Sequence, residues 1–359
     1  MKIVKWTLIG LVSFVVVLGL GLAGVAYFLH TPASEERLAR MQQSSLFQDG
    51  AFVNVERQAP TEITWEYLKE QFFGEQKREP DGVIPVVPVA ADVFTGPASQ
   101  ALKATWFGHA TVLVELEGKR VFVDPVFSER VSPVTYVGPK RMHPVPIDLA
   151  KVANVDAVVI SHNHYDHLDY HSVTEICSQS PETEIVLPLG LKAWFRRYVS
   201  KTAVLHELDW HERALIQDTA ITAVPMRHWS NRTGDRDKTL WCGFSVATKE
   251  KRFLFPADTA WFDDLEKIGE RYGPYDLAAL PIGAYEPRDF MKYHHINVEE
   301  AVRMKDAVRA ASAVPIHYGT FPLTFEPVAE PAEVLVKLMK GRKDENSFQP
   351  WLIGQSKLF

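Results

Sequence analysis

From about residue 100 onward, short apolar runs alternate with polar turns, which is the pattern of β-strands. The first run, Thr105–Leu116, is followed by a turn at Glu117-Gly118 and a second run at Arg120–Val123. The run at Val155–Ile160 is short and rich in β-branched residues, so it predicts a buried strand. Further runs predict strands at Glu184–Leu187, Ala220–Pro225, Gly243–Ala247, Arg252–Phe255, Leu277–Ile282 and Ala313–Ile316.

Helical patterns lie between several of these runs. One helix start is well marked, because Asn297 can cap a helix and Glu300 follows three residues later, as in a capping box. Ala301, Val302 and Val308 then follow at helical spacing. Strands interleaved with helices favour sheets covered by helices, an α/β layered sandwich.

The first thirty residues differ from the rest of the chain. The run Trp6–Leu29 contains no charged residue, and about 20 apolar residues span a bilayer core. A secretory signal peptide is the alternative, but its apolar core is usually about 7–15 residues long. Lys2 and Lys5 precede the run, which favours a cytoplasmic N-terminus. We expect residues 1–30 to be a single-pass membrane anchor, with the catalytic body outside the cytoplasm, in the periplasm if the cell is bacterial.

Residues 31–100 predict a connecting segment that wraps over the surface of the core. Prolines at 80, 85, 88 and 97 disfavour long helices and central strands there. At about 100–200 residues per domain, 359 residues suggest one large or two small domains. We therefore expect an anchor at 1–30, a linker at 31–100 and a catalytic domain at 101–359.

Composition excludes some classes of function. The net charge of −6 and the absence of a basic stripe argue against a nucleic-acid partner. Cys177 and Cys242 are the two cysteines, so a zinc knuckle or a disulfide framework is excluded, while a single bridge remains possible. The oligomeric state has no signature in the sequence.

The densest polar cluster, Ser161–Asp169, follows the predicted strand at Val155–Ile160 directly. It holds three histidines and two aspartates, in the pattern His-x-His-x-Asp-His. A lone histidine is more often a structural polar residue, but imidazole and carboxylate groups at this density are typical ligands of zinc. The spacing lets His162 and His164 reach one metal ion while Asp166 and His167 face a second.

Three further candidate ligands follow three other apolar runs. His228 follows Ala220–Pro225, Asp258 follows Arg252–Phe255, and His317 follows Ala313–Ile316. Together these residues predict a site for two Zn²⁺ ions that leaves each ion a place for water. The predicted ligands are His162, His164 and His228 for one ion, Asp166, His167 and His317 for the other, and Asp258 as the bridge.

This order of ligands resembles the metallo-β-lactamase superfamily, and within it the branch of N-acylphosphatidylethanolamine-hydrolysing phospholipase D. The similarity extends from Ala101 to the C-terminus. The predicted anchor is a difference from the family, some members of which associate only peripherally with membranes. The resemblance implies an αββα sandwich, here preceded by a transmembrane helix, and a phospholipid substrate cleaved to phosphatidic acid and an N-acylethanolamine. It rests on the ligands and on Ser161–Tyr170, Val186–Leu191, Glu207–Trp210 and Arg271–Arg288.

The chemistry of such a site needs further groups. Two Zn²⁺ ions, partly neutralised by two carboxylates, would suit an anionic phosphodiester. The resemblance favours His295 as the proton donor to the leaving group, which makes His295 and Asp166 the predicted catalytic residues. His294 is the competitor, and a surface histidine before a helix is the plain alternative. His109 and Asp124 are candidates for orienting the ligands, with turn capping or a core hydrogen bond equally open. His143, His171, His206 and His211 are interpreted as structural.

Other functions stay open at this point. A lactonase, or another hydrolase of this fold that acts on a carbonyl carbon, could use the same site. The position of Asp258 holds no cysteine, which argues against β-lactamases with a thiolate there but not against lactonases. A catalytically silent tether is disfavoured because every expected ligand is present.

Overall fold

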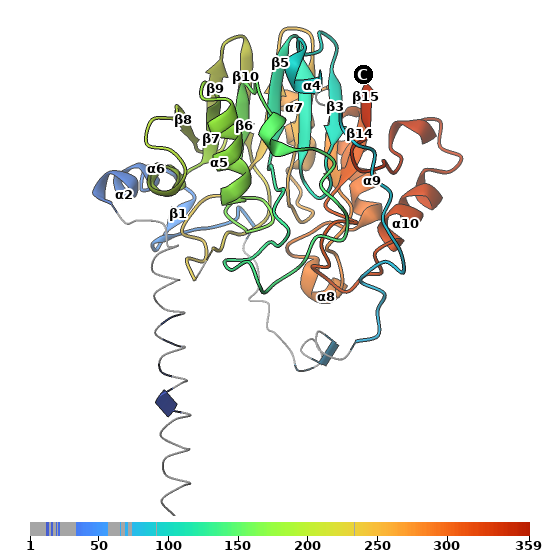
Figure 1. The fold of residues 1–359 in the computed structure, drawn as a ribbon, viewed down its shortest axis with the longest axis horizontal. Coiled ribbons are helices and arrows are strands. Elements are labelled where there is room, and N and C mark those ends of the chain that lie inside the picture. The colour runs from blue at the N-terminus through green and yellow to red at the C-terminus, as the bar shows by residue number, and fades with distance from the viewer. Residues whose placement is uncertain are drawn as a thin grey trace, which may run out of the picture.

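The computed structural model describes residues 12, 13, 16, 19, 21, 34–56, 65, 69–70, 74–90, 92–232 and 234–359 (Figure 1). Among these residues, none of the helices has the length and apolar character needed to cross a membrane. The anchor predicted at residues 1–30 lies almost entirely outside the described residues, so it stays a prediction.

The first sheet has seven strands in the order β15-β3-β4-β5-β6-β7-β8. Strands β5 to β8 run parallel to one another, whereas β15, β3 and β4 pair antiparallel. The bounds of these strands are Lys103–Trp106 (β3), Val112–Leu116 (β4), Lys119–Val123 (β5), Ala157–Val159 (β6), Glu184–Pro188 (β7), Leu205–Leu208 (β8) and Ser356–Leu358 (β15).

The second sheet has six strands in the order β14-β13-β12-β11-β10-β9. Strands β12 to β14 are parallel, and β9 to β12 pair antiparallel in sequence order. The strands are Arg213–Ile216 (β9), Thr219–Val224 (β10), Gly243–Ala247 (β11), Arg252–Phe255 (β12), Tyr275–Pro281 (β13) and Ala310–Ile316 (β14).

The two sheets pack face to face, and helices cover their outer faces (Figure 1). One apolar cluster joins both sheets, with Val114 and Val159 from the first and Phe244 and Phe253 from the second. A second cluster packs α7, α9 and α10 on the second sheet, and a third packs α5 and α6 on the first. These helices are Tyr170–Gln179 (α5), Lys192–Tyr198 (α6), Leu265–Tyr272 (α7), Val298–Ala307 (α9) and Glu330–Met339 (α10). The predicted layered α/β fold is therefore confirmed.

Shorter elements complete the described chain. The linker region holds helix α2, a two-stranded hairpin of β1 and β2, and helix α4, all against the sandwich (Figure 1). The bounds are Glu35–Met41 (α2), Phe47–Gln48 (β1), Ala51–Phe52 (β2), Asp92–Thr95 (α4), Leu149–Lys151 (η1), Arg288–Met291 (α8) and Glu345–Ser347 (η2).

Two local predictions have opposite outcomes. The single strand expected at Thr105–Leu116 is wrong, because the chain reverses between β3 and β4. Gly108 and His109 have φ angles of +99° and +51°, which no continuous strand adopts. In contrast, the helix start at Asn297 is confirmed, since its side chain and that of Glu300 form both bonds of a capping box.

Candidate metal centre

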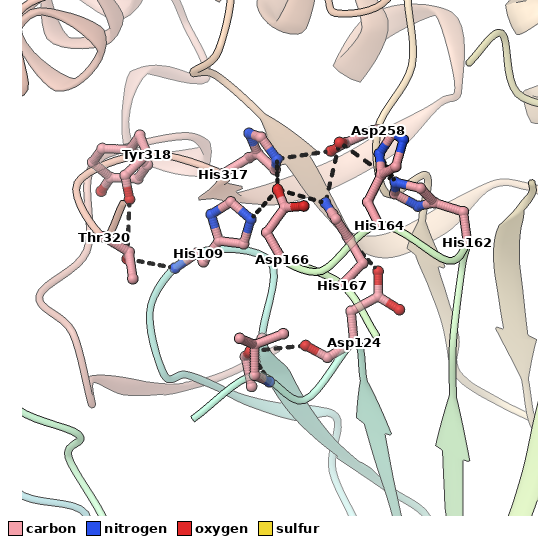
Figure 2. A network of polar contacts seen from close by, with 12 residues as sticks. His109, Asp124, His162, His164, Asp166, His167, Asp258, His317, Tyr318 and Thr320 are labelled. Carbon is pink, nitrogen blue, oxygen red and sulfur yellow. Dashed lines mark hydrogen bonds and ion pairs between the residues drawn. The ribbon is translucent and has the colours of Figure 1, made fainter. Parts of the chain in front are cut away.

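Loops from both sheets bring predicted ligands together, and Figure 2 shows Asp166, Asp258 and His317 among them. The cluster at residues 162–167 follows β6, while His228, Asp258 and His317 follow β10, β12 and β14. Strand β10 runs in the same direction as β12, because both are antiparallel to β11. In the second sheet, the carboxyl ends of β10, β12 and β14 therefore lie at the same edge. The structure brings the seven predicted ligands together.

The ligands form two groups of donor atoms. Nitrogen and oxygen atoms of His162, His164, His228 and Asp258 all lie within 4.8 Å of one another. The same limit holds for a second group of His109, Asp166, His167 and His317.

Asp258 lies between the two groups. Its Oδ2 is 3.6 Å from Nε2 of His228 in the first group and 3.1 Å from Nε2 of His167 in the second. Its Oδ1 is 3.2 Å from Nε2 of His317. This is the position that a bridging carboxylate requires.

Several donor atoms at the centre have no hydrogen-bond partner among the described residues. They are buried, and an unpaired buried polar atom is costly unless something else binds it. Imidazole nitrogens and carboxylate oxygens are also the ligands that zinc prefers. The residues present therefore fit a metal centre. The atoms are Nε2 of His164, His167 and His317, and Oδ1 of Asp258.

Three of the histidines are held in the neutral form that metal binding needs. Burial lowers the pKa of His162 well below its usual value, and the neighbouring His167 adds to this effect. Burial and the neighbouring His228 lower the pKa of His164 to about 3. Burial also lowers the pKa of His228 to about 4, against the charge of Asp258.

The two carboxylates are held in the ionised form. Burial, the largest single effect, would raise the pKa of both Asp166 and Asp258. The neighbouring histidines, His167 first among them, together outweigh burial and hold both pKa values well below the usual range. Burial alone would lower the pKa of His317, but Asp258 and Asp166 together raise it to about 9. Two ionised carboxylates, with Asp258 buried and Asp166 partly buried, create a demand for positive charge at this point.

Asp124, at the end of β5, orients the cluster from below. Its carboxylate accepts hydrogen bonds from the Ser161 amide at 2.8 Å, the Ser161 hydroxyl at 2.5 Å and Nδ1 of His167 at 2.7 Å. The bond to Nδ1 fixes the ring of His167 and leaves its Nε2 facing Asp258. These bonds favour the role of Asp124 as a residue that orients the ligand His167.

His109, a member of the second group that was not predicted as a ligand, connects the two sheets. Its Nε2 lies 3.1 Å from Oδ2 of Asp166, its amide donates to the hydroxyl of Thr320, and its carbonyl accepts from the amide of His317. Figure 2 shows His109, Asp166 and His317 side by side.

Four non-glycine residues at this centre have a strained backbone. His109, Asp124, Ala257 and His317 have φ angles of +51°, +38°, +55° and +63°. Each such non-glycine residue costs on the order of 1–3 kcal/mol, and surrounding contacts must hold it in place. Three of the four are ligand candidates or orienting residues, and Ala257 precedes Asp258.

His295 also lies at the centre, and His294 lies beside it, with its carbonyl 2.9 Å from Nδ1 of His228. Nδ1 of His295 is 3.9 Å from Oδ2 of Asp258, and burial lowers its pKa well below the usual value. The competitor His294 instead has its ring 5.7 Å from that of Trp229. Elsewhere, His143 bonds to Thr320, and His206 pairs with Glu184, in agreement with structural roles.

Sequence reasoning missed two residues that support the ligand loop. Ser161 bonds to Asp124, and its position directly before His162 was the available signal. Arg232 is buried and donates from Nη1 to the carbonyls of Asn163 and Leu168, at 3.1 and 2.7 Å. Its guanidinium also lies over the Tyr165 ring, at 4.0 Å from the centroid. Arg232 belongs to an irregular polar stretch, so no local pattern pointed to it.

Comparisons with known proteins agree with the fold and the motif. A family model described as the beta-lactamase superfamily domain matches residues 119–318. The chain is 42% identical over 278 residues to N-acyl-phosphatidylethanolamine-hydrolyzing phospholipase D 1 of Caenorhabditis elegans, covering 75% of this chain and 78% of that protein.

Two further proteins are more distant. The mitochondrial N-acyl-phosphatidylethanolamine-hydrolyzing phospholipase D of Saccharomyces cerevisiae is 34% identical over 250 residues, covering 67% of this chain and 53% of that protein. Among solved structures, an isothiocyanate hydrolase from Delia radicum gut bacteria aligns with a TM-score of 0.56 at 20% identity. That alignment covers 72% of this chain and 98% of the other, and it supports the fold alone.

Proposed function

The chain belongs to the β-lactamase superfamily and is a metal-dependent hydrolase, and from this premise we propose that it is a phosphodiesterase of the phospholipase D type. Its substrate would be an N-acylphosphatidylethanolamine or a similar phospholipid, and its products phosphatidic acid and an N-acylethanolamine. The observation that carries this proposal is the 42% identity over 278 residues to a relative named for that reaction. The seven converging ligand side chains support it.

Each metal ion would have its own set of residues. His162, His164 and His228 would hold one Zn²⁺, while Asp166, His167 and His317 would hold the other. Asp258 would serve both sets, because its carboxylate lies 3.6 Å from Nε2 of His228 and 3.1 Å from Nε2 of His167. When bound, two such ions lower the pKa of a water molecule to about 7 and polarise a phosphoryl oxygen.

The protein's own residues would set the charge and move the proton. Asp166 and Asp258 offset part of the positive charge, so the site would attract an anionic phosphodiester without holding it too tightly. The leaving alkoxide needs a proton, and we propose that the imidazole of His295 supplies it. His295 lies beside Asp258 and is buried, so bulk water would not compete for that transfer.

The site of bond cleavage tests this proposal. We expect the detergent-solubilised full chain, assayed in ¹⁸O-labelled water, to place one label in phosphatidic acid and none in the N-acylethanolamine, because attack is at phosphorus. Chelation should stop the reaction and added zinc should restore it.

A lactonase is the alternative that the same preparation can reveal. The phospholipase proposal is wrong if a lactone is hydrolysed with a kcat/KM well above that for the phospholipid. It is also wrong if the phospholipid is not cleaved. Label in a released fatty acid would likewise indicate attack on an acyl carbon.

A further inference from the structure

The described part of the N-terminal segment reaches the metal centre from outside the catalytic domain. Its hairpin of β1 and β2 is anchored by the Phe52 amide, which donates to the carbonyl of Asp237 at 2.8 Å. Phe52 is buried, and its ring lies 5.0 Å from that of Phe47. Two residues further on, Asn54 lies beside the backbone of His228.

The amide of Asn54 binds both backbone groups of His228. Its Nδ2 donates to the His228 carbonyl at 2.8 Å, and its Oδ1 accepts from the His228 amide at 3.1 Å. The same Oδ1 lies 3.2 Å from the indole nitrogen of Trp241, which donates to it. A side-chain amide is suited to this task because it carries a donor and an acceptor side by side.

His228 needs such support because it lies beyond the end of its strand. Strand β10 ends at Val224, so strand pairing with β11 does not hold the backbone of His228. The ring is fixed separately, since its Nδ1 lies 2.9 Å from the carbonyl of His294 and donates to it. With Nδ1 engaged, Nε2 faces Asp258 at 3.6 Å.

We propose that Asn54 is a positioning residue of the metal centre, which holds the backbone of His228 so that Nε2 points at one ion. The inference rests on the proposed function only in that His228 is a ligand. Partners that orient a metal ligand typically contribute about 10–100-fold to metal affinity. A segment outside the predicted catalytic domain thereby completes the site.

The neighbouring contacts of this segment supply a matched control. Glu56 pairs with Nη1 of Arg227 at 2.8 Å and accepts from the amide of Asp263 at 3.2 Å. These contacts attach the same segment to Arg227, next to His228, and to the loop that follows β12, but they do not touch His228. Glu56→Gln therefore weakens the attachment while leaving the support of His228 intact.

The test measures metal affinity on the full chain. Chelator-stripped protein is titrated with Zn²⁺ against a chromophoric chelator, for the natural sequence, Asn54→Ala and Glu56→Gln. We expect Asn54→Ala to weaken one of the two zinc equivalents by about 10–100-fold and to leave the other within a few-fold. Glu56→Gln should bind both equivalents almost as the natural sequence does.

A second variant keeps the test decisive if Asn54→Ala does not fold. Asn54→Asp has the same shape but sets an oxygen against the His228 carbonyl, so one equivalent should again weaken. The proposal is overturned if the folded variants bind both equivalents with natural affinity, or if Glu56→Gln loses as much affinity as Asn54→Ala. Failure of the natural sequence to bind zinc would overturn the metal centre itself, and no substrate is needed to see the difference.

Discussion

At the scale of single residues, Asp258 is the side chain on which both halves of the site depend. Its Oδ2 lies within 3.9 Å of ring nitrogens of His167, His228 and His295, its Oδ1 lies 3.2 Å from Nε2 of His317, and the residue is buried. Removing its charge would leave each group of histidines without the carboxylate that they share. The effect should therefore exceed that of losing any single histidine.

We expect Asp258→Asn to lower kcat by more than about 100-fold, because a preorganised charge at the reacting centre is lost. Loss of a metal site can also unfold a protein, so circular dichroism must accompany the assay. Asp263→Asn, at an exposed position in the following loop, is the matched control. Near-natural turnover by a folded Asp258→Asn would remove Asp258 from the site.

Residues of the site differed in how well the sequence predicted them. His228, Asp258 and His317 were found because each follows an apolar run whose end could be located in the sequence. Asn54 and Arg232 were not, because they lie in irregular segments and contact residues that only the fold brings near. Asn54 and His228 are separated by 174 positions in sequence, and no local pattern spans that distance.

At the scale of elements, the loops that follow β13 and β14 touch where the ligand His317 emerges. A methyl group added to Gly283 would overlap the carbonyl oxygen of His317 and would lie 3.2 Å from Cβ of Tyr318. Because His317 already has a positive φ angle of +63°, its backbone has little freedom to move away. The contact therefore fixes one ligand through the backbone of a neighbouring loop.

We expect Gly283→Ala to reduce the zinc content and lower Tm, since His317 must shift. Gly319→Ala is the matched control in the same loop as His317. Its φ of +64° makes alanine cost about 1–2 kcal/mol, but no atom lies within 4 Å of the added carbon. It should lower Tm and keep its zinc. Equal zinc contents in the two variants would argue against the overlap.

The sequence predicted the bounds of a strand best where the whole strand is buried, so that its apolar run has the same length as the strand. The bounds of β11 and β12 match the apolar runs residue for residue, because both strands lie inside the second sheet. The run at Thr105–Leu116 was wrongly predicted as one strand because the turn between β3 and β4 itself contains the apolar residues Phe107 and Ala110. Both are fully buried, so the turn carries no polar signal at those positions.

At the scale of the whole molecule, delivery to the bilayer is the prediction that stays open. The uncharged run Trp6–Leu29 would hold the catalytic domain at the membrane, where local concentration replaces free diffusion of a nearly insoluble substrate. The described chain from Ser34 to Glu56 is tied to the sandwich, for example by Arg37, which donates to the carbonyl of Gly190 at 2.8 Å. A truncation before Ser34 should therefore spare these contacts.

Deleting Met1–His30 should lower turnover of N-acylphosphatidylethanolamine in vesicles several-fold and leave kcat/KM for a short-chain, water-soluble analogue near that of the full chain. Loss of both activities would mean that the segment contributes to folding or to the site. If neither activity falls, the catalytic body binds the membrane unaided, or the natural substrate is not a membrane lipid.

The arrangement of the two sheets was the least predictable feature at this scale. The alternation of strands and helices indicated layers, but it does not specify which strands are neighbours. Strand β15 pairs with β3, so the last strand of the described chain lies beside one from the start of the catalytic domain. Such pairing depends on side-chain packing across the whole sheet, which periodicity alone does not encode.

The division of the ligands between the two sheets has a consequence for the lifetime of the folded state. Loops of the first sheet carry His162, His164, Asp166 and His167, while those of the second carry His228, Asp258 and His317. Metal ions held between these loops would link the two sheets as a covalent cross-link does. A disulfide that closed chain segments of this length would contribute about 4–5 kcal/mol to stability. Separating the sheets would then require the ions to leave first. The rate at which a chelator unfolds the protein would therefore report how fast the two sheets separate, and this rate can be measured without an activity assay.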